Sequence, residues 1–265
     1  MPTFFSGDAY LSYEIAGSGP DVVLLHPFPL NRHFWDSVTA QLSTRYRLVL
    51  PDLRAHGDSE LGEGPATMPK LAADLSRLCR EESINKAFFV GVSIGGYLLF
   101  EFWRRYRDHV AALVLANTRP AAETPEGKAN RLQLADRVLR KGTDTFIEEM
   151  LPKLLSQTTC TNRPDIVDAA RKMMQSMSAE DIAGVQRGMA ERPDSVATLS
   201  TINVPTLLIA GDEDSIPLSE FELMRQHIVG SRLQVISQAG HYAALEKPAE
   251  FGSLLRTFFD EVLRR

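Results

Sequence analysis

Short apolar runs alternate with longer stretches of helical periodicity along most of this chain. The runs are nearly continuous in aliphatic, aromatic and β-branched residues, and they occupy positions 21–26, 47–50, 86–90, 110–115, 206–210 and 233–236. Apolar runs without polar alternation are typical of parallel strands that are covered on both faces. Strands that alternate with helices predict an α/β fold in which helices flank a mostly parallel sheet.

Helical periodicity fills most of the intervals between these runs, at about 31–43, 67–82, 94–107, 217–229 and 248–264. In the second of these segments Leu71, Leu75 and Leu78 recur at three- and four-residue spacing, which makes one face apolar. Residues 9–16 alternate instead between polar and apolar and precede a glycine-rich turn. They predict an antiparallel edge strand.

The alternation stops between residues 118 and 201, where helical periodicity is interrupted by prolines and no strand pattern is present. An all-helical block within an α/β chain predicts an insertion. We therefore expect a core of residues 1–117 and 202–265 and a helical lid of residues 118–201. Five of the eight methionines, among them Met173 and Met177, lie in this block. They could form the lipophilic wall of a pocket or fill the insertion's own core, and the sequence favours neither.

The composition of the 265 residues is that of an ordinary globular protein, with 44% hydrophobic and 24% charged residues. A net charge of −5 argues against nucleic acid or a membrane surface as the main partner. Two cysteines are too few for a disulfide scaffold or a zinc site, and we expect neither a metal nor a cofactor. No secretory signal pattern and no apolar stretch of roughly 20 residues is visible, so we expect a cytoplasmic protein.

The motif Gly91-Val92-Ser93-Ile94-Gly95 comes directly after a predicted strand and directly before a predicted helix. A sharp turn between strand and helix would expose the hydroxyl of Ser93, and the flanking glycines relieve crowding that a Cβ would cause. The sequence therefore predicts Ser93 as a nucleophile, in preference to an ordinary glycine-rich turn.

A serine hydroxyl needs a general base, and the chain offers six histidines. His241 follows Gly240 in the loop after the last predicted strand, at the edge of the sheet where Ser93 also emerges. The other histidines lie in helices, near helix ends or in loops, where packing or surface roles account for them. We predict His241 as the base and interpret His26 as a structural brace for the loop that it begins.

The base needs an acid that fixes its tautomer. The loop after the strand at 206–210 contains three carboxylates, Asp212, Glu213 and Asp214. Asp214 is best placed to reach the loop of His241, and Asp212 is the alternative. Asn117 follows the strand at 110–115, so the other obvious location holds no acid.

An oxyanion hole requires two backbone N–H donors. The residue after the nucleophile, Ile94, supplies one. The second should come from the loop after the strand at 21–26, where Pro27 and Pro29 have no N–H and Phe28 is the donor between them. The ring of Phe28 should also project toward the pocket.

Serine, aspartate and histidine in this order, each in a loop after a strand, resemble the α/β-hydrolase superfamily over about residues 8–264. Residues 51–59, PDLRAHGDS, are similar to the superfamily's P-D-x-R-G-x-G-x-S loop, and residues 240–248, GHYAALEKP, are similar to its G-H…E-x-P ending. Ala55 and Pro27 stand where the superfamily usually has glycine. The resemblance implies an eight-stranded, mostly parallel sheet with a helical lid, and it is nearest to small esterases and enol-lactonase-like members.

The serine at the nucleophile position implies acyl transfer. It argues against a dehalogenase or an epoxide hydrolase, because the related enzymes of these two kinds use aspartate at that position. We expect a serine hydrolase that cleaves small carboxylic esters, short-chain or aryl, or lactones through an acyl-enzyme on Ser93. Alternatives are a C–C bond hydrolase or enol-lactonase of aromatic degradation and, in another class, a slow-turnover ligand sensor with the same fold. The sequence leaves the physiological substrate and the oligomeric state open.

Candidates for contact with the substrate are Phe28, Met173, Met177 and Tyr242. Arg187 or Arg192 in the helical block could bind an acidic substrate. A solvated face of the block accounts for both arginines more simply.

Overall fold

One eight-stranded sheet forms the centre of the computed structural model, which describes residues 1–264. The strands are β1 (Thr3–Phe5), β2 (Tyr10–Ala16), β3 (Asp21–Leu25), β4 (Arg47–Pro51), β5 (Ala87–Val92), β6 (Val110–Ala116), β7 (Thr206–Gly211) and β8 (Arg232–Ile236). Their order across the sheet is β1-β2-β4-β3-β5-β6-β7-β8. Pairing is antiparallel for β1–β2 and β2–β4 and parallel from β4 to β8, so the predicted mostly parallel sheet is confirmed.

The N-terminal edge of the sheet differs from the sequence prediction. Residues 9–16 contain an antiparallel strand, β2, but β1 pairs outside it, with Phe4 opposite Leu11. The edge strand is therefore β1. A strand of three residues is too short to show an alternating pattern, so β1 could not be predicted from the sequence.

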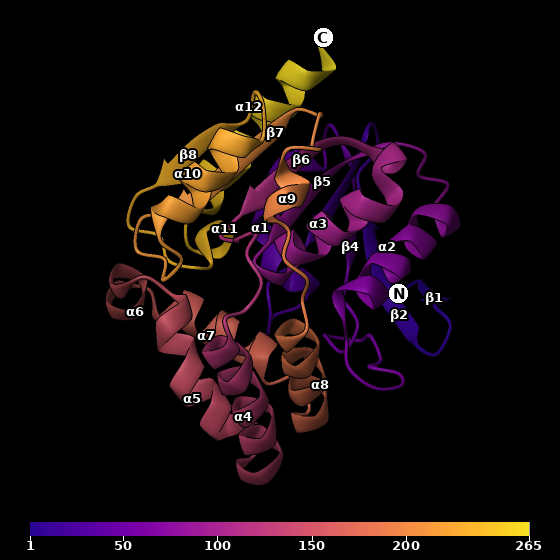
Figure 1. Cartoon of the computed structure of the whole chain (residues 1–265). Coiled ribbons are helices and arrows are strands. Elements are labelled where there is room, and N and C mark those ends of the chain that lie inside the picture. The colour runs from indigo at the N-terminus through magenta and orange to yellow at the C-terminus, as the bar shows by residue number, and fades with distance from the viewer. Residues whose placement is uncertain (265) are drawn as a thin grey trace.

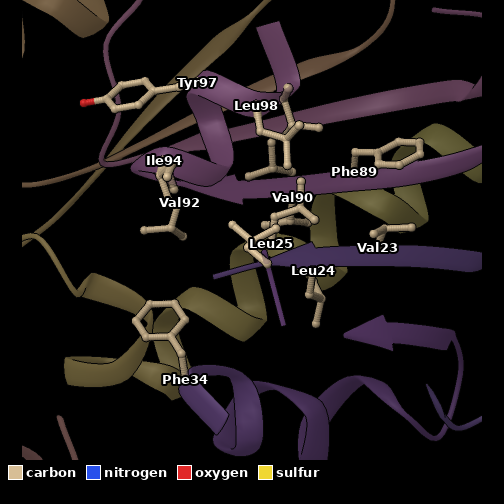
Figure 2. Packing of buried hydrophobic residues seen from close by; sticks show 14 of the residues in the cluster. Val23, Leu24, Leu25, Phe34, Phe89, Val90, Val92, Ile94, Tyr97 and Leu98 are labelled. Atoms are coloured by element: carbon tan, nitrogen blue, oxygen red, sulfur yellow. The ribbon is translucent and has the colours of Figure 1, made fainter. Parts of the chain in front are cut away.

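Helices cover both faces of the sheet. They are η1 (Arg32–Trp35), α1 (Asp36–Leu42), α2 (Met68–Glu81), α3 (Ile94–Tyr106), η2 (Arg107–His109), α10 (Leu218–His227), α11 (Ala243–Glu246) and α12 (Pro248–Leu263). In Figure 2 the side chain of Leu98 on α3 approaches the strands from one side, and Phe34 of η1 approaches them from the other. Helix α2 packs against α3, and α1 packs against α12. Each face thus has a layer of helices.

The core between these layers is formed by strand residues that have no exposed surface. Val23 and Leu25 on β3 and Phe89 and Val90 on β5 are all 0% exposed (Figure 2). Burial on both faces explains why these strands show no polar alternation in the sequence. The core fixes the carboxyl ends of the central strands, from which the candidate site is built.

Between β6 and β7 the described chain contains helices only, as the sequence predicted for residues 118–201. These helices are α4 (Pro125–Lys141), α5 (Thr143–Leu154), α6 (Gln157–Asn162), α7 (Pro164–Met174), α8 (Ala179–Ala190) and α9 (Val196–Leu199). Figure 1 shows α4 to α8 grouped at one end of the molecule, beyond one edge of the strand layer, with α4 beside α8. No helix within residues 1–264 is long and apolar enough to cross a bilayer.

Candidate active site

Ser93 occupies the turn between β5 and α3 in a strained backbone conformation. Its φ is 55° and its ψ is −113°, a region that residues other than glycine rarely adopt and that costs about 1–3 kcal/mol. Hydrogen bonds hold the turn in place: Ser93 N donates to Ala116 O at 3.0 Å, and Thr118 Oγ1 donates to Ser93 O at 2.9 Å. The turn projects the hydroxyl-bearing residue from the end of β5 into a cavity.

The glycines on either side of Ser93 are required by close backbone packing. A Cβ on Gly91 would lie 2.5 Å from the carbonyl carbon of Gly95, and a Cβ on Gly95 would lie 2.7 Å from Leu25 O. Both distances are far shorter than a van der Waals contact between these atoms. Only glycine at these two positions lets α3 begin this close to β3 and β5.

His241 and Asp214 form a hydrogen-bonded pair between the loops that follow β8 and β7. His241 Nδ1 lies 2.9 Å from Asp214 Oδ1 and 3.0 Å from Oδ2, and the Asp214 side chain is 0% exposed. Burial by itself raises the pKa of the Asp214 carboxyl. The electrostatic interaction with His241, its hydrogen bond and two further donors more than offset burial, so the pKa of Asp214 lies below its ordinary value. Asp214 is therefore held as a carboxylate beside the imidazole.

The other two carboxylates of the β7–α10 loop bind elsewhere. Asp212 Oδ1 accepts from Ala239 N at 3.3 Å and braces the chain after β8. Glu213 accepts from Gln157 N at 2.8 Å and so attaches the loop to α6 of the helical insertion. The three acids are thus distinguished by their partners, and Asp214, which the sequence favoured over Asp212, is the one at His241.

Asn117, at the end of β6, is part of the site. The sequence pointed to this position only as a place for the acid, and it holds none. Its Nδ2 donates to Asp214 Oδ2 at 2.8 Å and to Gly240 O at 3.2 Å. Its φ is +45°, in the left-handed region that asparagine tolerates better than most residues. Asn117 therefore orients both the carboxylate and the loop that carries His241.

Glu246 also holds the loop that carries His241. This buried side chain accepts from Gly240 N at 2.9 Å and from Ser156 N, at the beginning of α6, at 2.9 Å. Tyr242 N also donates to Leu154 O at 3.2 Å. The loop of His241 is thus bonded to the junction of α5 and α6.

Two backbone N–H groups are available near Ser93. Ile94 begins α3 and Phe28 lies in the β3–η1 loop, and within residues 1–264 neither N–H donates to a protein acceptor. Tyr242, which is 0% exposed, donates from its hydroxyl to Phe28 O at 3.2 Å. This bond holds the Phe28–Pro29 peptide, which follows the N–H of Phe28 in the loop.

His26 braces the same loop, as the sequence indicated. Its Nε2 accepts from Leu53 N at 2.9 Å, and its Nδ1 lies 3.0 Å from Pro27 O, to which it donates in that tautomer. Complete burial lowers the pKa of His26 to about 4, so the ring is neutral at physiological pH. A neutral ring with both nitrogens bonded is suited to support and is closed to proton transfer with a substrate.

Ser93 and His241 line one cavity of about 200 Å³. Its walls combine apolar side chains with polar and charged ones. The lining residues are Phe28, Ser93, Tyr97, Arg119, Arg131, Met150, Leu154, Gln186, Met189, Ser215, Ile216 and His241. The methionines at the cavity are Met150 and Met189. Met173, Met177 and Tyr242 are buried in the core and do not line it, which corrects the expectation that they contact the substrate. Helical periodicity predicts that a residue faces inward, but it does not distinguish the packed core from the cavity.

The arginines at the cavity also differ from those that the sequence pointed to. Arg187 is partly exposed and pairs with Asp136, so it lies on a solvated face as the simpler interpretation held. Arg192 is buried and does not line the cavity. Arg119 and Arg131 line it instead.

Comparison with known proteins agrees with the fold. The family model described as the alpha/beta hydrolase fold matches residues 20–248. The chain belongs to the α/β-hydrolase family, and the predicted resemblance is confirmed.

Esterases and enol-lactonases are among its relatives. A thermophilic esterase from Thermogutta terrifontis, solved with malate bound, is 39% identical, with a TM-score of 0.93 over 96% of this chain and 94% of that one. The 3-oxoadipate enol-lactonase 2 of Acinetobacter baylyi is 27% identical over 94% of this chain and 92% of its own length. The enol-lactonase from Burkholderia xenovorans LB400 is 25% identical, with a TM-score of 0.91 over 98% of this chain and 100% of that one.

Proposed function

We propose that the protein hydrolyses small carboxylic esters or lactones through an acyl-enzyme on Ser93, with His241 as base and Asp214 as the orienting acid. One observation carries this proposal: the buried His241–Asp214 pair and the strained Ser93 turn open into the same cavity. The similarity to esterases and enol-lactonases supports the same reaction class.

The proposed reaction proceeds in two halves. His241 Nε2 takes the proton from Ser93 Oγ as that oxygen attacks the carbonyl carbon, and the resulting oxyanion accepts from Phe28 N–H and Ile94 N–H. The tetrahedral intermediate collapses, and His241 returns the proton to the departing alkoxide. Water then attacks the acyl-enzyme with His241 again as base, which releases the acid and restores the serine.

The division into a core of residues 1–117 and 202–265 and a lid of residues 118–201 belongs to this proposal. Met150 and Leu154 on α5 and Gln186 and Met189 on α8 lie at the cavity together with Ser93. Helices of the insertion therefore contribute walls to the site, as a lid over the nucleophile should.

Lactone opening is a second candidate within the same chemistry, favoured by the two enol-lactonase relatives. In a lactone the departing alkoxide stays attached to the acyl group, so ring opening needs no room for a separate leaving group. Ester hydrolysis and lactone opening use the same triad, and assays with both types of substrate distinguish them.

A panel of short p-nitrophenyl esters, lactones and vinylogous diketones, assayed with the wild-type protein and Ser93→Ala, tests the proposal. We expect sustained turnover of esters or lactones by the wild type and none above background by the variant. A single burst that leaves a stalled adduct would support the ligand sensor instead, and turnover of the diketones alone would support the C–C bond hydrolase.

A further inference from the structure

The insertion brings three arginines together around one buried carboxylate beside the cavity of Ser93. Glu123, whose side chain is 5% exposed, accepts from Arg131 Nε at 2.6 Å and from Arg119 Nη2 at 3.0 Å. Arg192 Nη1 donates to the same carboxylate. Burial raises the pKa of Glu123, but the three guanidinium groups more than offset it and hold the pKa below its ordinary value. Glu123 is therefore a carboxylate that accepts hydrogen bonds from three guanidinium groups.

This cluster carries more positive than negative charge. Glu220 is a further carboxylate that acts on Arg119, and it forms no ion pair with it within 4 Å in the described part of the chain. Even with Glu220 included, the arginines outnumber the carboxylates by three to two. The side chains of Arg119 and Arg131 are 34% and 22% exposed, so their charge is accessible to an anionic ligand.

The three arginines have different surroundings. Arg192 is enclosed: its guanidinium also donates to Ala121 O and lies 4.3 Å from the ring centroid of Tyr97. Arg119 and Arg131 instead line the cavity. The excess charge is thus presented to the space that Ser93 and His241 share.

Donors at this wall are also left without partners. Arg119 Nε is buried and has no hydrogen-bond partner within residues 1–264. Gln186, which is 2% exposed, accepts from Arg131 Nη1 through Oε1 at 3.0 Å, and its amide nitrogen has no acceptor among the described residues. A buried donor without a partner, such as Arg119 Nε, is rare in protein interiors. Together with the unpaired amide nitrogen of Gln186, it makes this wall of the cavity suited to an anionic ligand group.

We propose that Arg119, Arg131 and Gln186 form a carboxylate subsite, and that the substrate is a short ester or lactone that carries a second, free carboxylate. The inference rests on the proposed hydrolase function and specifies its substrate class. A guanidinium matches a carboxylate with paired N–H donors. A cavity of about 200 Å³ lies below the range of roughly 300–1,000 Å³ of pockets for drug-sized ligands, which restricts the substrate to a small acid.

Two chromogenic esters of nearly equal shape test this: p-nitrophenyl hemiglutarate, which carries the extra carboxylate, and neutral p-nitrophenyl pentanoate. We expect kcat/KM to be about 10- to 100-fold higher for the hemiglutarate, the range of a hydrogen-bonded charge pair. Arg131→Gln and Arg119→Gln should lower the ratio of the two kcat/KM values by a similar factor. Arg187→Gln, on α8 but outside the cavity, is the matched control and should leave the ratio and both rates unchanged.

Inhibition of the wild-type protein provides a readout that does not depend on variants folding. Glutarate should compete with p-nitrophenyl pentanoate, whereas neutral glutaramide should not. Equal effects of glutarate and glutaramide, or an ester ratio near one, would overturn the subsite. Competition by inorganic phosphate as strong as that by glutarate would overturn its assignment to a carboxylate. If neither ester is hydrolysed, the proposed function fails, and calorimetric titration of glutarate and glutaramide then decides the subsite separately.

Discussion

Asn117 donates a hydrogen bond from Nδ2 to Oδ2 of Asp214 at 2.8 Å, on the carboxylate that also pairs with His241. The amide binds Gly240 O as well, so one side chain at the end of β6 aligns the loops after β7 and β8. Asn117 is a positioning residue, because it acts on the reaction through Asp214 and His241.

Substitutions of Asn117 should separate positioning from folding. Asn117→Gly keeps the left-handed backbone without strain and removes both hydrogen bonds. We expect kcat to fall about tenfold, the value of one bond to a charged group. Asn117→Asp adds a negative charge that favours the protonated imidazole, so the acid limb of kcat/KM should move up by about 1 pH unit. Steady-state kinetics across pH measures both effects. Wild-type kcat in the glycine variant and an unmoved acid limb in the aspartate variant would contradict this role.

The two candidate acids should respond differently to loss of charge. Asp214→Asn removes the carboxylate at His241 and leaves the size of the side chain, so we expect kcat to fall by about 10³- to 10⁴-fold, as in other triads. Asp212→Asn retains an oxygen that can accept from Ala239 N, and its kcat should stay within about twofold. Equal losses in the two variants would mean that Asp214 has no special role.

The backbone strain at Ser93 predicts a gain in stability when the side chain is removed. Ser93→Ala and Ser93→Gly both lack the nucleophile, but only glycine relaxes at a φ of 55° and a ψ of −113°. We expect the glycine variant to exceed the alanine variant by about 1 kcal/mol in the free energy of unfolding. Urea denaturation of the two inactive variants measures the difference, and an alanine variant of equal or greater stability would show that the turn is unstrained.

Burial of His26 makes the stability of the protein depend on pH. Its pKa is about 4 in the folded chain and lies near 6.5 when exposed, so the unfolded state binds more protons between these values. The contribution of His26 is complete above pH 6.5 and is lost as pH falls toward 4, by about 2 kcal/mol at pH 5. Burial also lowers the pKa of His56, to about 3, so the loss in the wild type includes a contribution from that residue. The contribution of His26 is measured as the difference between the wild type and His26→Gln in the free energy of unfolding lost between pH 7.5 and pH 5. His26→Gln should lose less stability over that interval, and an equal loss would contradict the account.

The sheet could be predicted because its signal is local. Residues of β3 and β5 are buried on both faces, so each strand is an unbroken apolar run whatever its neighbours are. The turn at Ser93 could be predicted for the same reason, because its signal is a short motif between a strand and a helix. The edge strand β1 has only three residues and gave no comparable signal.

The cavity walls could not be predicted because they depend on how distant elements meet. Met150 and Met173 both occupy inward positions of helices in the insertion, and only packing brings Met150 to the cavity. Arg131 resembles any charged residue on a polar helix until Glu123 and Gln186 are placed beside it. Asn117 was excluded as an acid, and its position at a strand end was the one sign of a role.

Gln157 N donates to Glu213 and Ser156 N donates to Glu246. These bonds attach the loops of Asp214 and His241 to the beginning of α6. The α5–α6 junction therefore cannot move outward without displacing the loops that carry Asp214 and His241. Helix α8 is also bonded to the core, because Ala66 N donates to Gly184 O at 3.2 Å. Two separate parts of the insertion are thus attached to the core, one beside the catalytic loops and one beside Gln186.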